Sequence, residues 1–499
     1  MMPIRPRRWE AGVRESVAPR CGALSCCGSS APGRRRGPPE AMPTPDRREA
    51  VSVEQARERI ASTVYRPDET APCCGQVGLE PEFLLFQLGA DGAPSGRVPL
   101  EANGGVLDCM SVVAGRRRRF RRAYGGPPPV YTLGDGGRIT FEPGAQVEHS
   151  TAIHATAAAA MADVEQTADA LLEAFDPAGF ALCASGIDLW SGLEGVPQQL
   201  RAPRYRAMAA YLANRGPQGA VMMRHTASLQ VNLDLGPPEV AAARWCVANL
   251  ASPLAAACFA SSPLDGAASR RAQAWQGLDP TRTGFPSLFL EGTEDDPGRQ
   301  YAEFALEADP LLFLGYEADE AAVPGQPGFR LRDWIEQGHA RHGYPRLSDV
   351  DYHLTTLFPE VRLRGFLELR AADAVPRRWR GALVVFWTGL LYDAESLDGA
   401  GELLGELRAA LPACWAAAAS EGLADPRLRA VAIDLWELAL AGAERLPAGF
   451  HRARDLRCAR EFRERFVAGG VSPSVELAAL HAEHPALSVE WGRERTAGD

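Results

Sequence analysis

Three short segments of the chain carry glutamates in a pattern that suits a β-strand with one polar face. They are Gly78–Glu82, Glu142–Glu148 and Phe366–Arg370, in which acids alternate with apolar residues. Successive side chains of a strand point to opposite faces, so each segment would place its acids on one face and its apolar residues in a core. If these acids share one site, strands far apart in the sequence must join a single sheet. We therefore predict an α+β fold, with one antiparallel sheet, a polar concave face and flanking helices.

Five glutamates of these segments are candidate metal ligands. Carboxylates placed side by side repel each other, and a divalent cation removes that penalty; ligand sets made only of oxygen suit Mg²⁺ or Mn²⁺. Metals there would bridge nucleotide phosphates and offset charge as a phosphoryl group moves. One such pair taken alone is as well explained by a solvated or salt-bridged sheet face, but three segments favour a site. The candidate ligands are Glu80, Glu82, Glu142, Glu148 and Glu368.

The chain contains no lysine, so all 53 basic residues are arginines. A Walker A loop needs its lysine on the phosphates, and a pyridoxal enzyme needs a lysine for its Schiff base, so both classes are excluded. Any phosphate bound here must be neutralised by metal and by arginine, whose fork matches phosphate oxygens. We expect Arg370 or Arg282 to stabilise the transferring phosphoryl group.

Other polar residues are candidate contacts for substrate or ATP. Residues 228–234 alternate strictly, which predicts a half-buried strand with a polar face. The loop 279–284 combines arginine, threonine and glycine, a set that can donate to a phosphate or carboxylate, although an ordinary capped turn would look the same. A helical segment at 203–213 could hold a substrate carboxylate, but an exposed helix face explains it equally well. The residues concerned are Gln146, Gln230, Asn232, Arg271, Trp275, Thr283, Arg204 and Tyr205.

The coarse pattern divides the chain into a leader and one catalytic domain over 49–499. Residues 1–48 are rich in Arg, Pro, Gly and Ser without periodicity, which predicts a disordered basic leader. We expect helices at about 52–64, 151–176, 203–213 and 236–262, strands at 78–88, within 138–149, at 180–187, 228–234 and 361–371, and helices from 377 onward.

Bulk properties favour a soluble, cytoplasmic protein with small-molecule partners. The net charge of −10 argues against a dedicated nucleic-acid binder. The eleven cysteines are odd in number, which fits a reduced interior. The leader lacks the apolar run of a signal peptide, and we expect no membrane span. The arginine run at 116–122 leaves an RNA-binding alternative open, although such a run is usually a solvated loop.

Several stretches resemble the glutamate–cysteine ligases of the plant and bacterial type, within the glutamine-synthetase-like carboxylate–amine ligases. Their Glu-Pro-Gly-x-Gln-x-Glu and Phe-Pro-Glu-Val-Arg motifs are specific, whereas Gly-x-Glu-x-Glu is less so. The matching stretches are Gly78–Glu82, Glu142–Glu148, Met222–Asp234, Trp275 with Asp279–Gly284, and His353–Asp373.

The resemblance implies a sheet folded as a half-funnel with ATP and Mg²⁺ inside, and metal ligation by the five glutamates. Gln230 falls where some relatives place a metal-binding histidine. His225, with Arg224 beside it, stands where plant relatives carry a substrate-binding arginine. The arrangement around Met222–Asp234 is most similar to the bacterial branch that supplies ergothioneine synthesis.

Together these features predict ATP-dependent ligation of the L-glutamate γ-carboxylate to the L-cysteine amine through a γ-glutamyl phosphate. One alternative is a carboxylate–amine ligase with a different acceptor. Another is a non-catalytic nucleotide-binding relative, whose mark would be a lost metal carboxylate; none of the five is missing.

Overall fold

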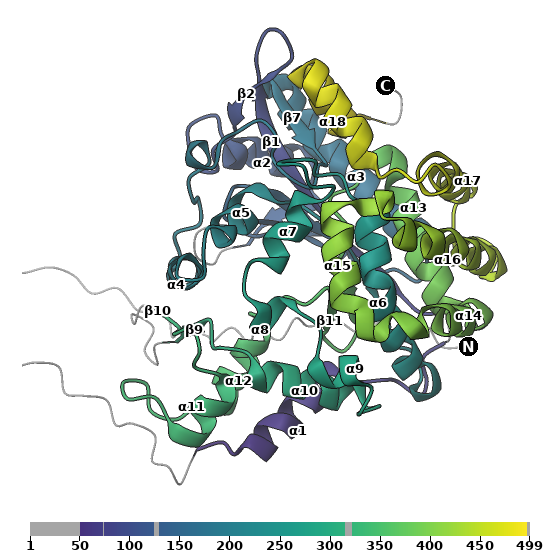
Figure 1. The fold of residues 1–499 in the computed structure, drawn as a ribbon. Coiled ribbons are helices and arrows are strands. Elements are labelled where there is room, and N and C mark those ends of the chain that lie inside the picture. The colour runs from purple at the N-terminus through teal and green to yellow at the C-terminus, as the bar shows by residue number, and fades with distance from the viewer. Residues whose placement is uncertain (1–49, 73, 124–128, 315–321, 497–499) are drawn as a thin grey trace, which may run out of the picture.

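The computed structural model describes residues 50–72, 74–123, 129–314 and 322–496. A large antiparallel sheet is flanked by helices (Figure 1). The predicted α+β class with one antiparallel sheet and flanking helices is therefore confirmed. The predicted leader, residues 1–48, lies outside the described residues, and the single catalytic domain over 49–499 stays a prediction.

The main sheet is centred on β1, and every pairing in it is antiparallel. Its path runs β11-β12-β8-β1-β6-β5-β4-β3, and β2 and β7 also pair with β1. A separate ribbon joins β9 and β10. The strands are β1 Val77–Leu88, β2 Pro94–Arg97, β3 Phe120–Arg122, β4 Tyr131–Leu133, β5 Arg138–Phe141, β6 Val147–Ser150, β7 Phe180–Cys183, β8 Leu229–Leu233, β9 Leu312–Phe313, β10 Val323–Pro324, β11 Val361–Leu363 and β12 Leu367–Leu369.

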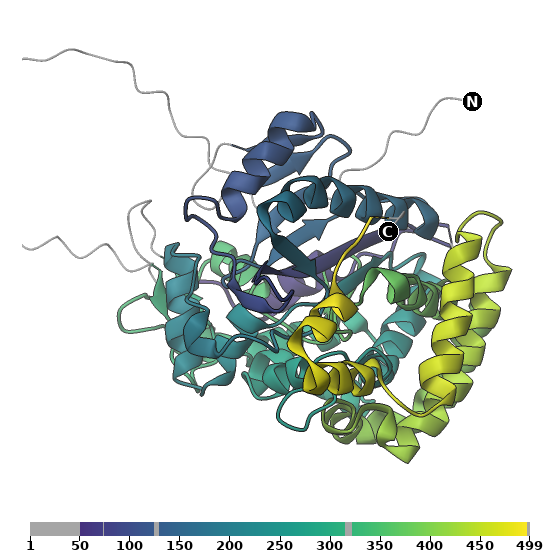
Figure 2. The ribbon, with the colours of Figure 1, turned by 90° about the horizontal axis from the view of Figure 1, so that it is seen from above.

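Helices make up most of the rest of the described chain, and α16 and α17, yellow-green, lie at one side of the molecule (Figure 2). The helices are α1 Val53–Val64, α2 Val106–Arg116, α3 Ala157–Phe175, α4 Pro203–Ala213, α5 Gln218–His225, α6 Pro238–Cys258, α7 Arg270–Gln276, α8 Pro280–Thr283, α9 Ser287–Glu291, α10 Pro297–Glu307, α11 Leu331–Gln337, α12 Leu347–Leu354, α13 Arg377–Tyr392, α14 Ala394–Leu404, α15 Leu411–Ser420, α16 Pro426–Arg445, α17 Ala453–Phe462, α18 Pro473–Glu483 and α19 Pro485–Gly492.

The apolar face of the sheet supplies the core, as the alternation predicted. Leu79 on β1, Val231 on β8 and Leu369 on β12 are adjacent in register and almost completely buried. They belong to one core cluster with residues of α6 and α13. The polar side chains at the intervening positions are therefore directed to the opposite face.

Among the described residues, one helix, α6, is long and apolar enough to cross a membrane by length and composition alone. However, 78% of its most apolar window is buried inside the fold. That burial is the pattern of a core helix, and it agrees with the packing of Trp245 and Leu250 in the main core.

Several predicted elements differ from those observed. The predicted strand at 180–187 ends at Cys183, and the predicted helix at 236–262 ends at Cys258. The predicted strand 361–371 is a hairpin, in which β11 and β12 pair through Arg362 and Glu368. The chain turns at Gly365, whose φ of 77° suits glycine and disfavours other residues. The predicted helix at 151–176 begins later, because Thr156 caps it by accepting from the N–H of Ala159.

Candidate active site

The polar face of the sheet brings the three predicted acidic segments together in register. Glu80 lies opposite Gln230 on β8, and Asn232 lies opposite Glu368 on β12. On the other edge of β1, Glu82 is directly opposite Glu148 of β6. Directly opposite residues of an antiparallel pair have side chains on the same face about 5 Å apart at Cβ. Strands β12, β8, β1 and β6 thus present four of the five acids on one surface.

Amide and hydroxyl side chains of β8 hold the two glutamates of β1. Asn232 donates from Nδ2 to Glu80 over 3.1 Å, and Gln230 donates from Nε2 to Glu82 over 3.1 Å. The backbone N–H and hydroxyl of Ser228 also donate to Glu82, over 2.8 and 3.0 Å. These bonds fix the orientation of both carboxylates, and Ser228 is a residue that sequence reasoning placed on the polar face without assigning it a role.

Glu368 is completely buried and is surrounded by arginines. Arg362 donates to it across the hairpin, and Arg364 lies 3.3 Å from it. Arg370 lies 3.6 Å away and donates to Gln230 over 2.8 Å. Burial alone would raise the pKa of Glu368, but these three cations outweigh it and lower the pKa to about 2. Glu368 is therefore a fixed anion at neutral pH.

The fifth acid, Glu142, stands in a turn between β5 and β6. The turn is closed by Gln146, whose side chain accepts from the N–H of Gly144 over 2.9 Å and donates to the carbonyl of Thr226 over 2.9 Å. Gln146 is 1% exposed, so it shapes the turn in this structure. Glu148 follows on β6 and accepts from the Thr140 hydroxyl over 2.6 Å.

The carboxylates outside the arginine cluster repel one another. Burial, followed by the charges of Glu368 and Glu148, raises the pKa of Glu80 to about 7. Burial and then the charges of Glu148 and Glu82 raise the pKa of Glu142 to about 8. Burial also raises the pKa of Glu82 and of Glu148. Negative charge is thus concentrated here beyond what the neighbouring cations compensate.

The donor set on this face fits a hard divalent cation, because it consists of oxygens with uncompensated charge. The Oδ1 atom of Asn232 is buried and has no hydrogen-bond partner among the described residues, so one more oxygen acceptor lies beside the acids. Within residues 50–72, 74–123, 129–314 and 322–496, however, no three His, Cys, Asp or Glu side chains are grouped closely enough to hold a metal ion. The assignment of the five glutamates as metal ligands stays a prediction.

Two arginines and a tryptophan border the acidic face. The guanidinium of Arg370 lies 5.3 Å from the ring centre of Trp275, and that of Arg271 lies 5.9 Å from it. Arg271 donates to the carbonyl of Arg370 over 2.9 Å, so it holds the end of β12. The Nε1 atom of Trp275 is buried without a partner in the described part of the chain. An unpaired buried donor beside Arg370 suits an anionic ligand.

Arg204 and Tyr205 begin α4 close to the turn that carries Glu142. Burial and the charge of Glu142 raise the pKa of Tyr205 to about 12, and Arg204 is among the groups that oppose the rise of the Glu142 pKa. Arg204 is exposed, and its guanidinium lies 5.3 Å from the ring centre of Tyr205. Both residues are thus within electrostatic range of the acids, although their substrate contacts stay predictions.

The structure does not bring Arg282 and Thr283 to the acidic face. Arg282 is 0% exposed, and its guanidinium donates to Asp279 over 2.8 Å and to the carbonyl of Thr356 over 2.8 Å. Thr283 donates to the carbonyl of Asp279 over 3.0 Å. The predicted loop 279–284 contains the short helix α8, which Asp279 caps. In this arrangement both residues hold that segment together, and their contacts with phosphate stay predictions.

The sequence did not predict that Arg362 would pair with Glu368. The alternation placed it on the face of Glu368, but only the hairpin turn at Gly365 makes the two residues direct partners. The available signal was Gly365, a glycine inside an otherwise alternating strand pattern.

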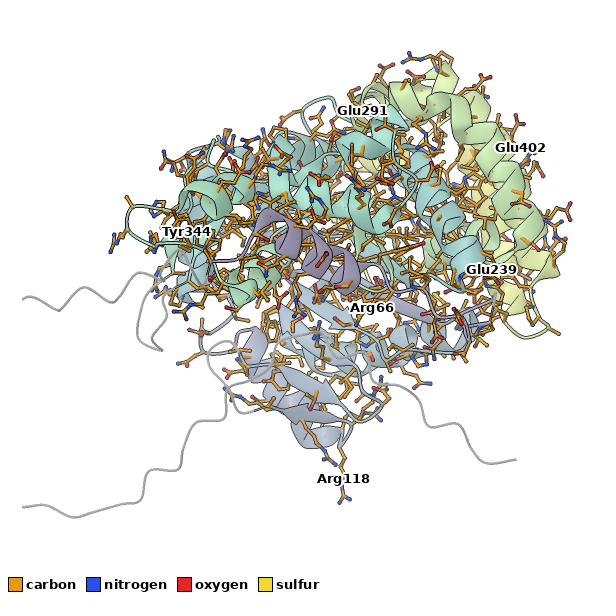
Figure 3. The ribbon with its side chains drawn as sticks, turned by 90° about the horizontal axis from the view of Figure 1, so that it is seen from below. Arg66, Arg118, Glu239, Glu291, Tyr344 and Glu402 are labelled. Atoms are coloured by element: carbon orange, nitrogen blue, oxygen red, sulfur yellow. The ribbon has the colours of Figure 1, made fainter. Side chains whose placement is uncertain are left out.

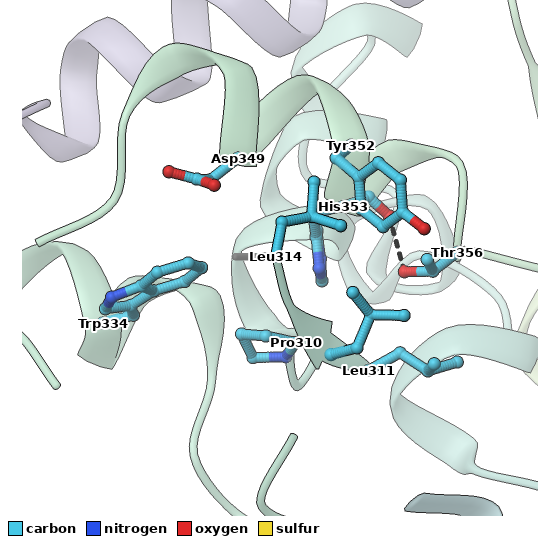
Figure 4. Close-up of a pocket in the computed structure, with 9 residues that line it drawn as sticks. Pro310, Leu311, Leu314, Trp334, Asp349, Tyr352, His353 and Thr356 are labelled. Atoms are coloured by element: carbon cyan, nitrogen blue, oxygen red, sulfur yellow. Dashed lines mark hydrogen bonds between the residues drawn. The ribbon is translucent and has the colours of Figure 1, made fainter. Parts of the chain in front are cut away.

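Two cavities lie outside the acidic face. One of about 600 Å³ runs between α4 and α5 and is lined by Ala209, Met223 and Arg224, among others. The other, of about 10 Å³, is shown in Figure 4 beside His353 and Tyr352. The Nε2–H of His353 donates to the carbonyl of Ala305 over 2.9 Å, and burial lowers the pKa of His353 to about 3. It is a neutral core histidine at physiological pH.

Two arginines of the basic run at 116–122 form ion pairs within the fold. Arg117 pairs with Glu173, and Arg119 pairs with Asp163. Arg118 points away from the body of the molecule into solvent (Figure 3).

Comparison with known proteins identifies the family. Residues 76–492 match glutamate–cysteine ligase family 2 (GCS2). The chain belongs to this family. The matched region spans every strand of the acidic face, from β1 to β12, so the family match and the geometry describe the same part of the molecule.

Several glutamate–cysteine ligases are similar to this protein over most of the chain. The glutamate–cysteine ligase EgtA of Mycolicibacterium smegmatis is 34% identical over 404 residues, which cover 77% of this chain and 91% of that protein. EgtA of Mycobacterium tuberculosis is 34% identical over 419 residues, which cover 79% of this chain and 91% of that protein. The chloroplastic glutamate–cysteine ligase of Nicotiana tabacum is 32% identical over 377 residues, which cover 71% of this chain and 67% of that protein.

A crystal structure of the glutamate–cysteine ligase of Francisella tularensis in complex with AMP superposes with a TM-score of 0.47 at 12% identity. The superposition covers 84% of this chain and 87% of that one.

Proposed function

We propose that this protein catalyses the ATP-dependent ligation of the γ-carboxylate of L-glutamate to the amine of L-cysteine, giving γ-glutamylcysteine. The observation that carries the proposal is the placement of the family's acidic segments on one face, with Glu82 opposite Glu148 and Glu368 within reach of Arg370. Membership of glutamate–cysteine ligase family 2 supports the same reaction.

The reaction must first activate a carboxylate, whose own leaving group would be oxide. An oxygen of the glutamate γ-carboxylate attacks the γ-phosphorus of ATP, and ADP leaves. The cysteine amine then attacks the acyl carbon, the carbon–oxygen bond to phosphate breaks, and the amine loses a proton. One glutamate oxygen therefore ends in inorganic phosphate.

The residues of the site supply binding and fixed charge for these steps. Arg370 is held by Gln230 at 2.8 Å and stands beside Trp275, so its remaining donors can contact a phosphoryl oxygen. Arg204, exposed at the start of α4, would bind a substrate carboxylate. The glutamates of β1 and β6, with Glu142 and Glu368, would hold Mg²⁺ or Mn²⁺, which neutralises phosphate charge when bound.

Similarity to the mycobacterial EgtA proteins supports a place in ergothioneine synthesis. Those relatives are covered over 91% of their length, compared with 67% for the tobacco enzyme. We place the enzyme in the cytoplasm with ATP, glutamate and cysteine as its partners.

The test is isotope transfer during turnover. The protein would be incubated with ATP, Mg²⁺, cysteine and glutamate carrying ¹⁸O in its γ-carboxylate, and the products analysed by mass spectrometry. We expect γ-glutamylcysteine and one ¹⁸O in each phosphate released. Phosphate free of ¹⁸O would exclude the acyl phosphate, and equal turnover with amines that lack a thiol would exclude cysteine as the specific acceptor.

A further inference from the structure

We propose that Arg97, on β2, is a positioning residue that fixes the turn carrying Glu142 into the active site. The inference rests on the proposed function, since Glu142 matters only if its face binds substrates. Arg97 lies outside the acidic segments and outside the loop 279–284, so no sequence motif assigned it a role.

The turn between β5 and β6 needs external support because its backbone is unfavourable. Ala145 has a φ of 64°, in the left-handed region that residues other than glycine rarely adopt. The N–H of Ala145 donates to the carbonyl of Glu142 over 2.8 Å, and the N–H of Glu142 donates to the carbonyl of Gln146 over 3.0 Å. A non-glycine residue keeps such a conformation only when its surroundings impose it.

Gln146 gives part of that support through Gly144 and Thr226, and Arg97 adds to it from a buried position. Its side chain is 4% exposed, and Nη2 donates to the carbonyl of Gly144, inside the turn, over 2.8 Å. Nη1 donates to the carbonyl of Arg224, at the end of α5, and pairs with Asp188, both over 3.3 Å. One guanidinium therefore joins the turn to α5 and to the loop after β7.

The turn is pressed against α5 at the same place. A Cβ atom added at Gly144 would lie 2.2 Å from the carbonyl oxygen of Arg224, so the two backbones touch. Both carbonyl groups accept from Arg97, so one guanidinium ties the two backbones together where they touch. Glu142 is two residues from Gly144, so a shift of the turn moves its carboxylate.

A lysine in place of Arg97 could not make the same three contacts. Three acceptors surround the planar fork of Arg97 from different sides, and a single ammonium group on a flexible stem cannot reach them in the same geometry. Lysine would nevertheless keep the charge opposite Asp188, whose other oxygen accepts from the N–H groups of Trp190 and Ser191 over 3.0 and 2.9 Å. Arg97→Lys thus tests position without leaving a buried carboxylate unpaired.

The chain offers a matched control in Arg244 on α6. It is also buried, and it donates to two backbone carbonyls, those of Leu391 over 2.7 Å and Asp234 over 3.3 Å. Its guanidinium lies 4.7 Å from the ring centre of Tyr392, as that of Arg97 lies 5.5 Å from the ring centre of Phe86. Arg244→Lys should cost comparable stability without moving the turn.

The experiment compares both variants with the wild type in three measurements: thermal midpoint, steady-state kinetics, and Mn²⁺ binding followed by electron paramagnetic resonance without substrates. We expect both variants to unfold at lower temperature. Only Arg97→Lys should lower kcat, by about 10- to 100-fold with the KM for cysteine changed less than about twofold, since small misplacement of a catalytic group has effects of this size. Only Arg97→Lys should weaken Mn²⁺ binding.

Equal losses of kcat and Mn²⁺ affinity in the two variants would overturn the proposal, and so would unchanged kcat and Mn²⁺ affinity in Arg97→Lys. If the wild type forms no dipeptide, the proposed function fails instead, and the Mn²⁺ comparison still decides whether Arg97 positions the turn.

Discussion

Replacing Glu80 by glutamine should stabilise the metal-free protein while abolishing ligation. Glu80 is partly buried beside the charges of Glu368 and Glu148, and its pKa of about 7 exceeds the ordinary value of 4.5. That difference corresponds to about 3 kcal/mol of unfolding free energy. Glutamine keeps the shape and can still accept from Asn232, but it carries no charge.

The sign of the effect follows from proton linkage. The folded state holds the Glu80 proton more tightly than the unfolded state, so the Glu80 contribution to stability falls as pH rises from 4.5 to 7 and stays low above 7. In EDTA at pH 8 we expect Glu80→Gln to be more stable than the wild type by about 3 kcal/mol. At pH 5 the difference should fall below about 1 kcal/mol, since Glu80 is then mostly protonated.

The assay is urea denaturation followed by tryptophan fluorescence, in EDTA, at both pH values. Glu173→Gln is the control, because Arg117 lowers the pKa of this exposed glutamate and its replacement should not stabilise the protein. Added Mg²⁺ should reduce the advantage of Glu80→Gln. A variant less stable than the wild type at pH 8, or an advantage that persists at pH 5, would refute the electrostatic reasoning.

Three further substitutions give distinct outcomes in the same urea assay. Glu368→Gln leaves three arginines around a neutral amide and should destabilise by about 3–5 kcal/mol as well as stop ligation; an unchanged midpoint would contradict the buried ion cluster. The wild type should exceed His353→Gln in unfolding free energy, and this difference should shrink by about 1.4 kcal/mol per pH unit below pH 6. The reason is that burial keeps folded His353 neutral while the unfolded chain takes up a proton. A difference that stays constant with pH would mean that His353 is protonated in the folded protein. Gly365→Ala should cost about 1–2 kcal/mol, since φ is 77° there and the new Cβ would lie 2.5 Å from the Arg66 guanidinium; no loss would show that the hairpin turn is not as described.

The strands of the active face could be predicted because their signal is local. Leu229, Val231 and Leu233 alternate with polar residues, and such a period fixes both the strand and its two faces. The turn at Gly144 was also visible, because Pro143 and Gly144 interrupt an alternating pattern.

Register and tertiary partners could not be predicted from the same signal. Alternation continues through residues 361–371 whether or not the chain reverses at Gly365, so it cannot distinguish one strand from a hairpin. The pairing of Arg362 with Glu368 therefore could not be predicted. The loop 279–284 looked suited to phosphate, but the burial of Arg282 depends on Asp309 and Thr356, which lie far away in sequence. Arg97 has no pattern around it, and the role proposed for it follows from its hydrogen bonds to the carbonyls of Gly144 and Arg224, which are distant in sequence.

A crystal structure with Mn²⁺ and a non-hydrolysable ATP analogue, with manganese located by anomalous scattering, would show directly whether the acidic face binds metal and nucleotide together. We expect peaks about 2.1 Å from carboxylate oxygens of the acidic face, bridged to the nucleotide phosphates. The ligands expected are Glu80, Glu82, Glu142, Glu148 and Glu368. Manganese bound elsewhere, with these glutamates still in their metal-free hydrogen bonds and ion pairs, would show that they do not hold the metal.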